Sequence, residues 1–246
     1  MKFEMLYPEV ANLHGDNHNI VYLGRCRPDA TIVRTGLTDV PAFATGPVDL
    51  VYLGPLTERG QLIAVKHLLP YKQRIAELIE QGKVFLFTHN AWEVLGERIH
   101  NVSQGYDEPG LGLFPMTSQI DLLQRYNGKV MGQVNGSTVV GYKSQFSMVE
   151  AGDTLPGFLL AESGIGRNRA TRVEGVRHHN FIGTSLLGPL LVMNPLFTKE
   201  LLRLIDPDSE PVLAFEDLAL QAYEARLAQF REPSRWHPWE QPAAIR

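Results

Sequence analysis

The chain has 246 residues, of which 44% are hydrophobic, 20% charged and 9% aromatic. This composition is typical of a folded globular protein and excludes a disordered chain, which has fewer apolar residues and a larger net charge. The formal net charge of −4 gives no general electrostatic reason to bind nucleic acid or an anionic membrane. The sequence has no apolar run of membrane-spanning length, so we expect neither membrane insertion nor a nucleic-acid partner.

The chain contains one cysteine, Cys26, which excludes an internal disulfide framework. The first ten residues lack the apolar core of a signal peptide. We therefore expect a cytoplasmic protein.

The first half of the chain alternates strand and helix signals. Four apolar runs predict strands: 2–7, 31–34, 48–53 and 84–88. The continuous apolarity of the last two runs is typical of strands buried on both faces of a parallel sheet. Apolar residues spaced by three and four predict helices at 16–27 and 61–81, the second of them interrupted at Pro70.

The second half predicts shorter β segments and one long helix. The β segments are expected at 110–114, 129–134, 138–140 and 158–160. Helices are expected at 91–99 and 215–230, the latter with Leu218, Leu220, Tyr223 and Leu227 facing inward. Together these elements predict an α/β fold with a central mixed, mostly parallel sheet, formed by residues 1–231.

Residues 232–246 form a Pro/Trp-rich C-terminal tail. Its prolines oppose regular structure, so Trp236 and Trp239 either pack on the domain or contact a partner. Both readings stay open at the level of sequence.

One turn has the features of a site. Thr88-His-Asn-Ala-Trp92 follows a buried strand, where enzymes with an elbow between strand and helix expose a nucleophile beside a helix N-terminus. Here the exposed position is His89. A histidine there could bind an anion, act as a base, or serve only as a hydrogen-bonded structural residue.

The eight histidines suggest no metal site. His14 precedes the predicted helix that contains His18, so the two are not expected to share a face. The adjacent His178 and His179 are expected to point to opposite faces of a strand. With no nucleotide signature either, we expect neither a metal nor a cofactor.

Short motifs occur in a recognisable order along nearly the whole chain. They are Asn12-Leu-His-Gly-Asp16, Asp49-Leu-Val-Tyr-Leu-Gly54 with Glu58 and Gln61, Trp92-Glu-Val-Leu-Gly96, and Gly188-Pro-Leu-Leu-Val-Met-Asn-Pro195. In content and order they resemble CobB/CobQ-like class I glutamine amidotransferases, most closely the GatD-type glutaminase subunit of lipid II isoglutaminyl synthase. The resemblance implies a three-layer, flavodoxin-like fold and a Mur-ligase-like partner subunit.

The resemblance also implies a mechanism whose residues are missing from this chain. In that family an elbow cysteine attacks the glutamine amide, a histidine activates it, and the ammonia passes to a partner ligase. The cysteine position falls on His89 and the histidine position on Leu187. The glycine-rich oxyanion turn becomes Gly54-Pro55-Leu56, in which Pro55 has no amide proton.

Two further positions differ from the family. The glycines after the nucleophile become Asn90 and Ala91, and the arginine that holds the substrate carboxylate aligns with Lys129, which lacks the guanidinium fork. Because loss of a nucleophile alone costs about a million-fold in a triad hydrolase, we expect no glutaminase activity. The expected function is a non-catalytic binding or scaffold subunit of a Mur-ligase-like enzyme. The alternative is an active amidotransferase or hydrolase that uses a non-standard site around His89, supplying ammonia for lipid II or cobyric-acid-type amidation.

The former substrate cleft could persist as a binding site. We expect Gly54, His89, Asn90 and Lys129 to line it and an amino-acid-like molecule to occupy it. The alternative is a cleft filled by the side chains of Leu56 and Leu187.

Overall fold

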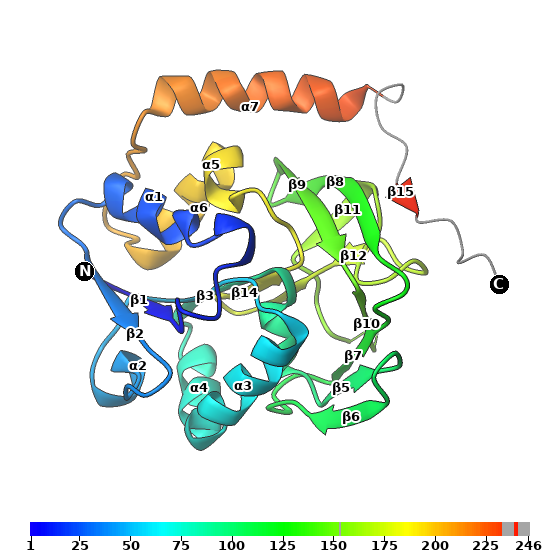
Figure 1. Cartoon of the computed structure of the whole chain (residues 1–246). Coiled ribbons are helices and arrows are strands. Elements are labelled where there is room, and N and C mark those ends of the chain that lie inside the picture. The colour runs from blue at the N-terminus through cyan, green and yellow to red at the C-terminus, as the bar shows by residue number, and fades with distance from the viewer. Residues whose placement is uncertain (153, 233–238, 241–246) are drawn as a thin grey trace.

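A computed structural model describes residues 1–152, 154–232 and 239–240 (Figure 1). Its centre is a six-stranded sheet in the order β13-β14-β4-β3-β1-β2. These strands are β1 (Lys2–Leu6), β2 (Thr31–Thr35), β3 (Leu50–Leu53), β4 (Val84–Thr88), β13 (Val176–His178) and β14 (Phe181–Thr184). All neighbours are parallel except β13 and β14, so the mixed, mostly parallel sheet is confirmed.

Helices cover both faces of this sheet (Figure 1). One face carries α1 (His18–Cys26), α5 (Leu190–Met193) and α6 (Pro195–Ile205), and the other carries α3 (Glu58–Leu68) and α4 (Lys72–Glu80). The short η2 (Leu69–Tyr71) separates α3 from α4 at Pro70, as the sequence predicts. Two short elements, η1 (Leu13–Gly15) and α2 (Ala42–Thr45), complete this half.

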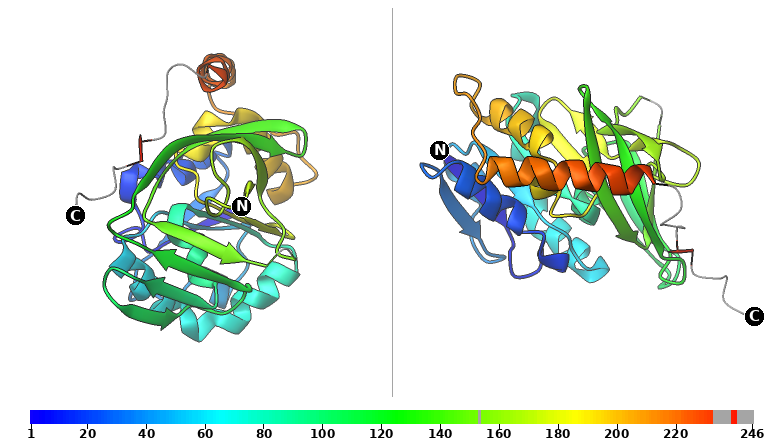
Figure 2. Two further views of the ribbon diagram at one scale, coloured as in Figure 1. Left: turned by 90° about the vertical axis from the view of Figure 1, so that its right-hand side faces the viewer. Right: turned by 90° about the horizontal axis from the view of Figure 1, so that it is seen from above.

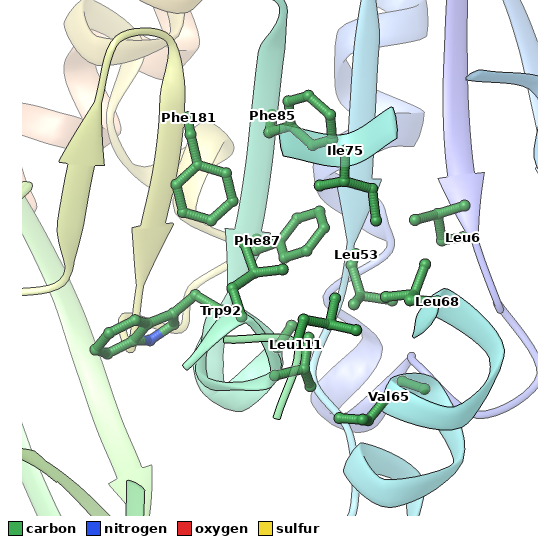
Figure 3. Close-up of a cluster of buried hydrophobic side chains, with 14 of the residues drawn as sticks. Leu6, Leu53, Val65, Leu68, Ile75, Phe85, Phe87, Trp92, Leu111 and Phe181 are labelled. Carbon is green, nitrogen blue, oxygen red and sulfur yellow. The ribbon is translucent and has the colours of Figure 1, made fainter. Parts of the chain in front are cut away.

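Alternating side chains on β3 and β4 explain why both strands are wholly apolar. Leu53, Phe85 and Phe87 point toward α3 and α4, where they pack with residues such as Leu68 and Ile75 (Figure 3). Their neighbours, including Tyr52 and Leu86, face the opposite core with α1 and α6. Both faces are therefore buried, as the continuous apolarity predicts.

Two smaller sheets extend from one end of the central sheet (Figures 1 and 2). One contains β5 (Arg98–Asn101), β6 (Tyr106–Pro109), β7 (Met116–Ile120) and β10 (Ser147–Ala151). The other contains β8 (Tyr126–Val134), β9 (Ser137–Gln145), β11 (Leu159–Ser163), β12 (Val173–Glu174) and β15 (Trp239–Glu240). The β segments predicted at 129–134 and 138–140 lie within the long hairpin of β8 and β9.

Two predicted elements are wrong. The helix expected at 91–99 is the 3-10 helix η3 (His89–Leu95), followed directly by β5. The strand expected at 110–114 does not form, because its amides pair with the end of η3. Leu111 N donates to Val94 O at 2.8 Å, and Gly112 N donates to Gly96 O at 2.7 Å. The open carbonyls of a short helix thus take the bonds that a strand would need.

The helix α7 (Glu216–Arg231) crosses the molecule outside the other helices (Figures 1 and 2). Tyr223, Leu227 and Phe230 are buried, and they pack with Val140 of β9. The inward placement of Leu218 is wrong, since 65% of this residue is exposed.

In the tail, Trp236 lies outside the described residues, while Trp239 pairs in an antiparallel register with Asn127 of β8. Among the helices that the structure describes, none combines the length and apolarity needed to cross a membrane.

Candidate functional site

The site is built around the turn that follows β4. This strand lies inside the central sheet, between β3 and β14, and ends at Thr88. The next residue, His89, has a φ of 55°, an uncommon value for a residue other than glycine. The predicted position of His89 at the carboxyl end of an interior strand is therefore confirmed, and the backbone there turns as sharply as a nucleophile elbow.

The imidazole of His89 is buried and neutral. Its Nε2 lies 3.0 Å from Ser144 O, so Nε2 carries the proton and Nδ1 keeps a lone pair. Burial lowers the pKa of His89 below its ordinary value. Nδ1 has no well-formed hydrogen bond to any residue that the structure describes. The ring of His14 lies 5.8 Å away, centre to centre.

A buried network of hydrogen bonds supports the turn after β4. Thr88 Oγ1 donates to Asp16 Oδ2 at 2.5 Å, and Tyr52 OH donates to Asp16 O at 2.8 Å. Burial raises the pKa of Asp16. A side chain at Gly54 would place Cβ 2.6 Å from Ala11 O, so only glycine fits this close approach. The first two motifs of the sequence thus meet at the end of β4.

The side chain of Asn90 forms two hydrogen bonds to the turn 54–56, where an oxyanion hole would need free amides. Its Oδ1 accepts from Leu56 N at 2.9 Å, and its Nδ2 donates to Leu56 O at 2.8 Å. Pro55 has no N–H to offer. In the turn 54–56, the amide of Leu56 is therefore already used inside the protein.

A cavity of about 160 Å³ opens beside His89. Its lining includes His14, Glu58, Gln61, Arg125 and Gln145. Four of the lining atoms are buried without a hydrogen-bond partner in the described part of the chain: Gln61 Oε1, His89 Nδ1, Arg125 Nε and Gln145 Oε1. Buried polar atoms are rarely left unpaired, so a concentration of them around one cavity indicates a polar ligand or bound water.

The orientation of the two amides is fixed by other bonds. Gln61 Nε2 donates to Asn90 O at 2.9 Å, and Gln145 Nε2 donates to Ser147 O at 2.6 Å. Each amide therefore has its Oε1 left as an unpaired acceptor in the described part of the chain. Arg125 supplies a donor and a positive charge. The cavity consequently suits a molecule that has both N–H donors and an acidic group.

The cation in the cavity is Arg125, which the sequence reading did not identify. Its Nη2 donates to Ser144 Oγ at 2.7 Å, and its guanidinium carbon lies 5.2 Å from the ring centre of Phe146. Lys129 lies elsewhere: its Nζ donates to Gln229 O at 3.0 Å, against α7.

Leu187 and His89 both form hydrogen bonds to the backbone of β9. Leu187 N donates to Tyr142 O at 2.8 Å, two residues before the Ser144 carbonyl that holds His89. Both dyad positions are thus attached to β9. Leu187 is buried and offers no titratable atom, so the position has no group that could serve as a base.

A buried charged group lies next to the site and was also missed. Lys143 Nζ lies 3.4 Å from Glu174 Oε1, and both side chains are fully buried. Glu174 also accepts from Ser185 N at 2.8 Å, which fixes the segment leading to Leu187. Burial lowers the pKa of Lys143 and raises that of the neighbouring Glu93. These contacts join residues far apart in sequence, so no local pattern announces them.

Comparison with known proteins supports the fold independently. No family model matches the chain. The chain is 25% identical over 197 residues to the GatD subunit of the glutamine-hydrolysing lipid II isoglutaminyl synthase of Staphylococcus aureus, covering 78% of each protein.

Solved structures with the same fold include a glutamine amidotransferase, with a TM-score of 0.54, 13% identity and coverage of 82% of this chain and 98% of that one. Another glutamine amidotransferase, from Thermotoga maritima, has a TM-score of 0.51 and 8% identity, with coverage of 94% of this chain and 95% of that one. PurLQS from Thermotoga maritima has a TM-score of 0.50 and 14% identity, with coverage of 92% of this chain and 98% of that one. The glutamine amidotransferase fold predicted from the sequence is confirmed, together with similarity in sequence to GatD.

Proposed function

We propose that this chain is a GatD-like subunit without glutaminase activity, which acts as a binding or scaffold partner of a Mur-ligase-like enzyme. The observation that carries the proposal is the state of the elbow. A buried neutral histidine occupies the nucleophile position, with its Nε2 held by Ser144 O at 3.0 Å. A thioester needs a thiolate at that position, and imidazole does not replace it in this chemistry.

The single cysteine of the chain, Cys26, does not replace the missing nucleophile. Cys26 is buried at the end of α1, where its Sγ accepts from Ala214 N at 3.3 Å. Burial raises the pKa of Cys26, which disfavours the reactive thiolate. The base position holds Leu187, and the amide of Leu56 is bonded to Asn90. Nucleophile, base and oxyanion donor are therefore lost together.

The cavity supports a retained binding role for a small zwitterionic molecule of the amino-acid class. Arg125 would pair with a carboxylate, and Glu58, the first residue of α3, would attract an ammonium group. The acceptors Gln61 Oε1 and Gln145 Oε1 would take the remaining N–H donors. Binding of this kind fits a subunit that senses or holds an amino acid and leaves it unchanged.

Ligand binding is tested by thermal denaturation with a panel of amino acids and small carboxylates. A ligand present at 100 times its Kd adds about 2.7 kcal/mol of stability, which raises the melting temperature by several degrees. We expect Arg125→Met to abolish the shift and Lys129→Met to keep it. A shift that needs Lys129 and survives Arg125→Met would contradict the placement of the ligand in this cavity.

The partner part of the proposal rests on the similarity to GatD, which is named as a subunit of a synthase. A chain that has lost the dyad can still be kept if its surface stabilises a ligase. Co-expression with a Mur-ligase-like protein from the same organism should give one complex on a sizing column. A variant that ends at Arg231, the last residue of α7, tests whether the Trp-containing tail makes the contact. Separate elution of the two full-length proteins would contradict the partnership.

One feature supports the alternative function, which is an active hydrolase or amidotransferase centred on His89. His89 lines the cavity, and its Nδ1 could accept a proton. Catalysis of that kind still requires a water or other nucleophile and an acid partner for the imidazole. Assay of ammonia release from glutamine by the wild-type chain and by His89→Asn separates this alternative from the first proposal.

A further inference from the structure

A second cluster of titratable side chains lies beside the edge strand β13 of the central sheet, at the turn before β14. Both His178, at the end of β13, and His179, in the turn before β14, contact Glu80. The distances from their Nε2 atoms to the Glu80 carboxylate oxygens are 2.7 Å and 3.3 Å. The expectation that the two histidines point to opposite faces is therefore wrong.

The physical reason is the backbone of the turn. His179 has a φ of 50°, in the left-handed region, so the alternation of a regular strand is broken after His178. The two rings consequently lie on the same side, 4.5 Å apart, centre to centre. Sequence spacing gives no sign of this geometry, since adjacent histidines do not predict a positive φ.

The three ligand atoms are close enough to share one ion. One atom from each of Glu80, His178 and His179 lies within 4.8 Å of the other two. Two nitrogens bound to one zinc at about 2.0–2.1 Å lie roughly 3.4 Å apart at the tetrahedral angle. Small side-chain rotations would therefore bring all three groups onto a metal. Two imidazoles and one carboxylate are the donor set that zinc and its neighbours in the first transition row prefer.

The electrostatic setting also favours a cation. Glu80 is the last residue of α4, where the helix dipole places partial negative charge. The last turn of α4 carries no basic side chain that would occupy this charge.

The cluster is held by its surroundings. Asn180 Nδ2 donates to Gly82 O at 2.7 Å, which fastens the hairpin turn to the loop after α4. The ring of His178 packs edge-on against Phe114, with the ring centres 5.9 Å apart. A cavity of about 250 Å³, lined in part by Glu80, His178 and Phe114, lies directly beside the cluster. It leaves room for a water or an external ligand at an open coordination position.

We propose that Glu80, His178 and His179 bind one divalent transition-metal ion of the zinc class, joining the end of α4 to the β13–β14 hairpin. The residues of this site differ from those that line the cavity beside His89, so the metal site does not depend on the proposed function. Because the three ligands come from segments 98 residues apart, a bound ion would also stabilise the edge of the central sheet.

The test is titration of the full chain with ZnCl₂, followed by calorimetry and by thermal denaturation. We expect one ion per chain and a rise in melting temperature. Glu80→Gln and His179→Asn should each weaken zinc binding by about tenfold or more, as is usual when the ligation of a site is disturbed. Asparagine is chosen at position 179 because it tolerates a positive φ, so the turn should keep its shape.

His100→Asn is the matched control. His100 is a partly exposed histidine beside a carboxylate, with its Nδ1 3.9 Å from Asp107 Oδ1, and within the described part of the chain it belongs to no group of three potential metal ligands. Its substitution should leave zinc affinity unchanged. Zinc binding that survives both Glu80→Gln and His179→Asn, or no binding to the wild-type chain, would overturn the proposal.

Discussion

Replacement of Lys143 by methionine is expected to lower the free energy of unfolding by about 3–5 kcal/mol, the usual effect of removing one partner of a buried ion pair. Lys143 Nζ donates to Gly166 O at 2.7 Å and lies 3.4 Å from Glu174 Oε1, with no exposed surface on either side chain. Without the ammonium group, the buried carboxylate of Glu174 would lose its ion-pair contact with Lys143 and keep its hydrogen bonds from Thr184 and Ser185.

The loss should be measured by urea denaturation at neutral pH. Lys66→Met is the control, because Lys66 is an exposed residue of α3 and its substitution should change stability by about 0.5 kcal/mol or less. The same loss in both variants would show that the effect belongs to methionine substitution in general. An unchanged stability in Lys143→Met would contradict the assignment of a buried, charged pair.

Restoring the dyad alone is expected to give no measurable glutaminase activity. The double variant His89→Cys/Leu187→His regains a thiol at the elbow and an imidazole at the base position. The amide of Leu56, however, stays bonded to Asn90 Oδ1 at 2.9 Å, and Pro55 still lacks a proton. Removal of one oxyanion donor costs a hydrolase about 10²–10³ in kcat, so the double variant lacks an essential part of the site.

Adding Pro55→Gly and Asn90→Gly to that variant should free two amides in the turn. We expect this quadruple variant to release ammonia from glutamine at a rate about 100-fold or more above that of the double variant. Equal rates in the two would show that the turn is not what limits hydrolysis. Circular dichroism would confirm that each variant keeps its fold, since Asn90 holds Leu56 through two hydrogen bonds.

Much of the central sheet could be predicted because its information is local. The runs that form β3 and β4 are apolar on both faces, and the turn after β4 carries a polar residue at a sheet edge. These signals placed His89 correctly. They also placed the break between α3 and α4, since Pro70 cannot continue a helix interior.

The remainder depends on contacts that no local pattern records. Residues 110–114 do not form a strand because their amides bond to carbonyls at the end of η3. The cation that lines the cavity is Arg125 because this residue, directly before β8, lies next to the cavity. A strand reading cannot anticipate the positive φ of His179. The ion pair of Lys143 and Glu174 joins β9 to β12, so it becomes visible only when the sheets are assembled.

We propose that the elbow of this chain does not support hydrolysis of glutamine. The most direct measurement is ammonia release from glutamine by the wild-type protein, alone and with the proposed Mur-ligase-like partner, against a reaction without protein. We expect a rate equal to that background in both cases, because His89 stands where a thiolate must form. Ammonia release above background that is lost in His89→Asn would contradict the account and establish catalysis at His89.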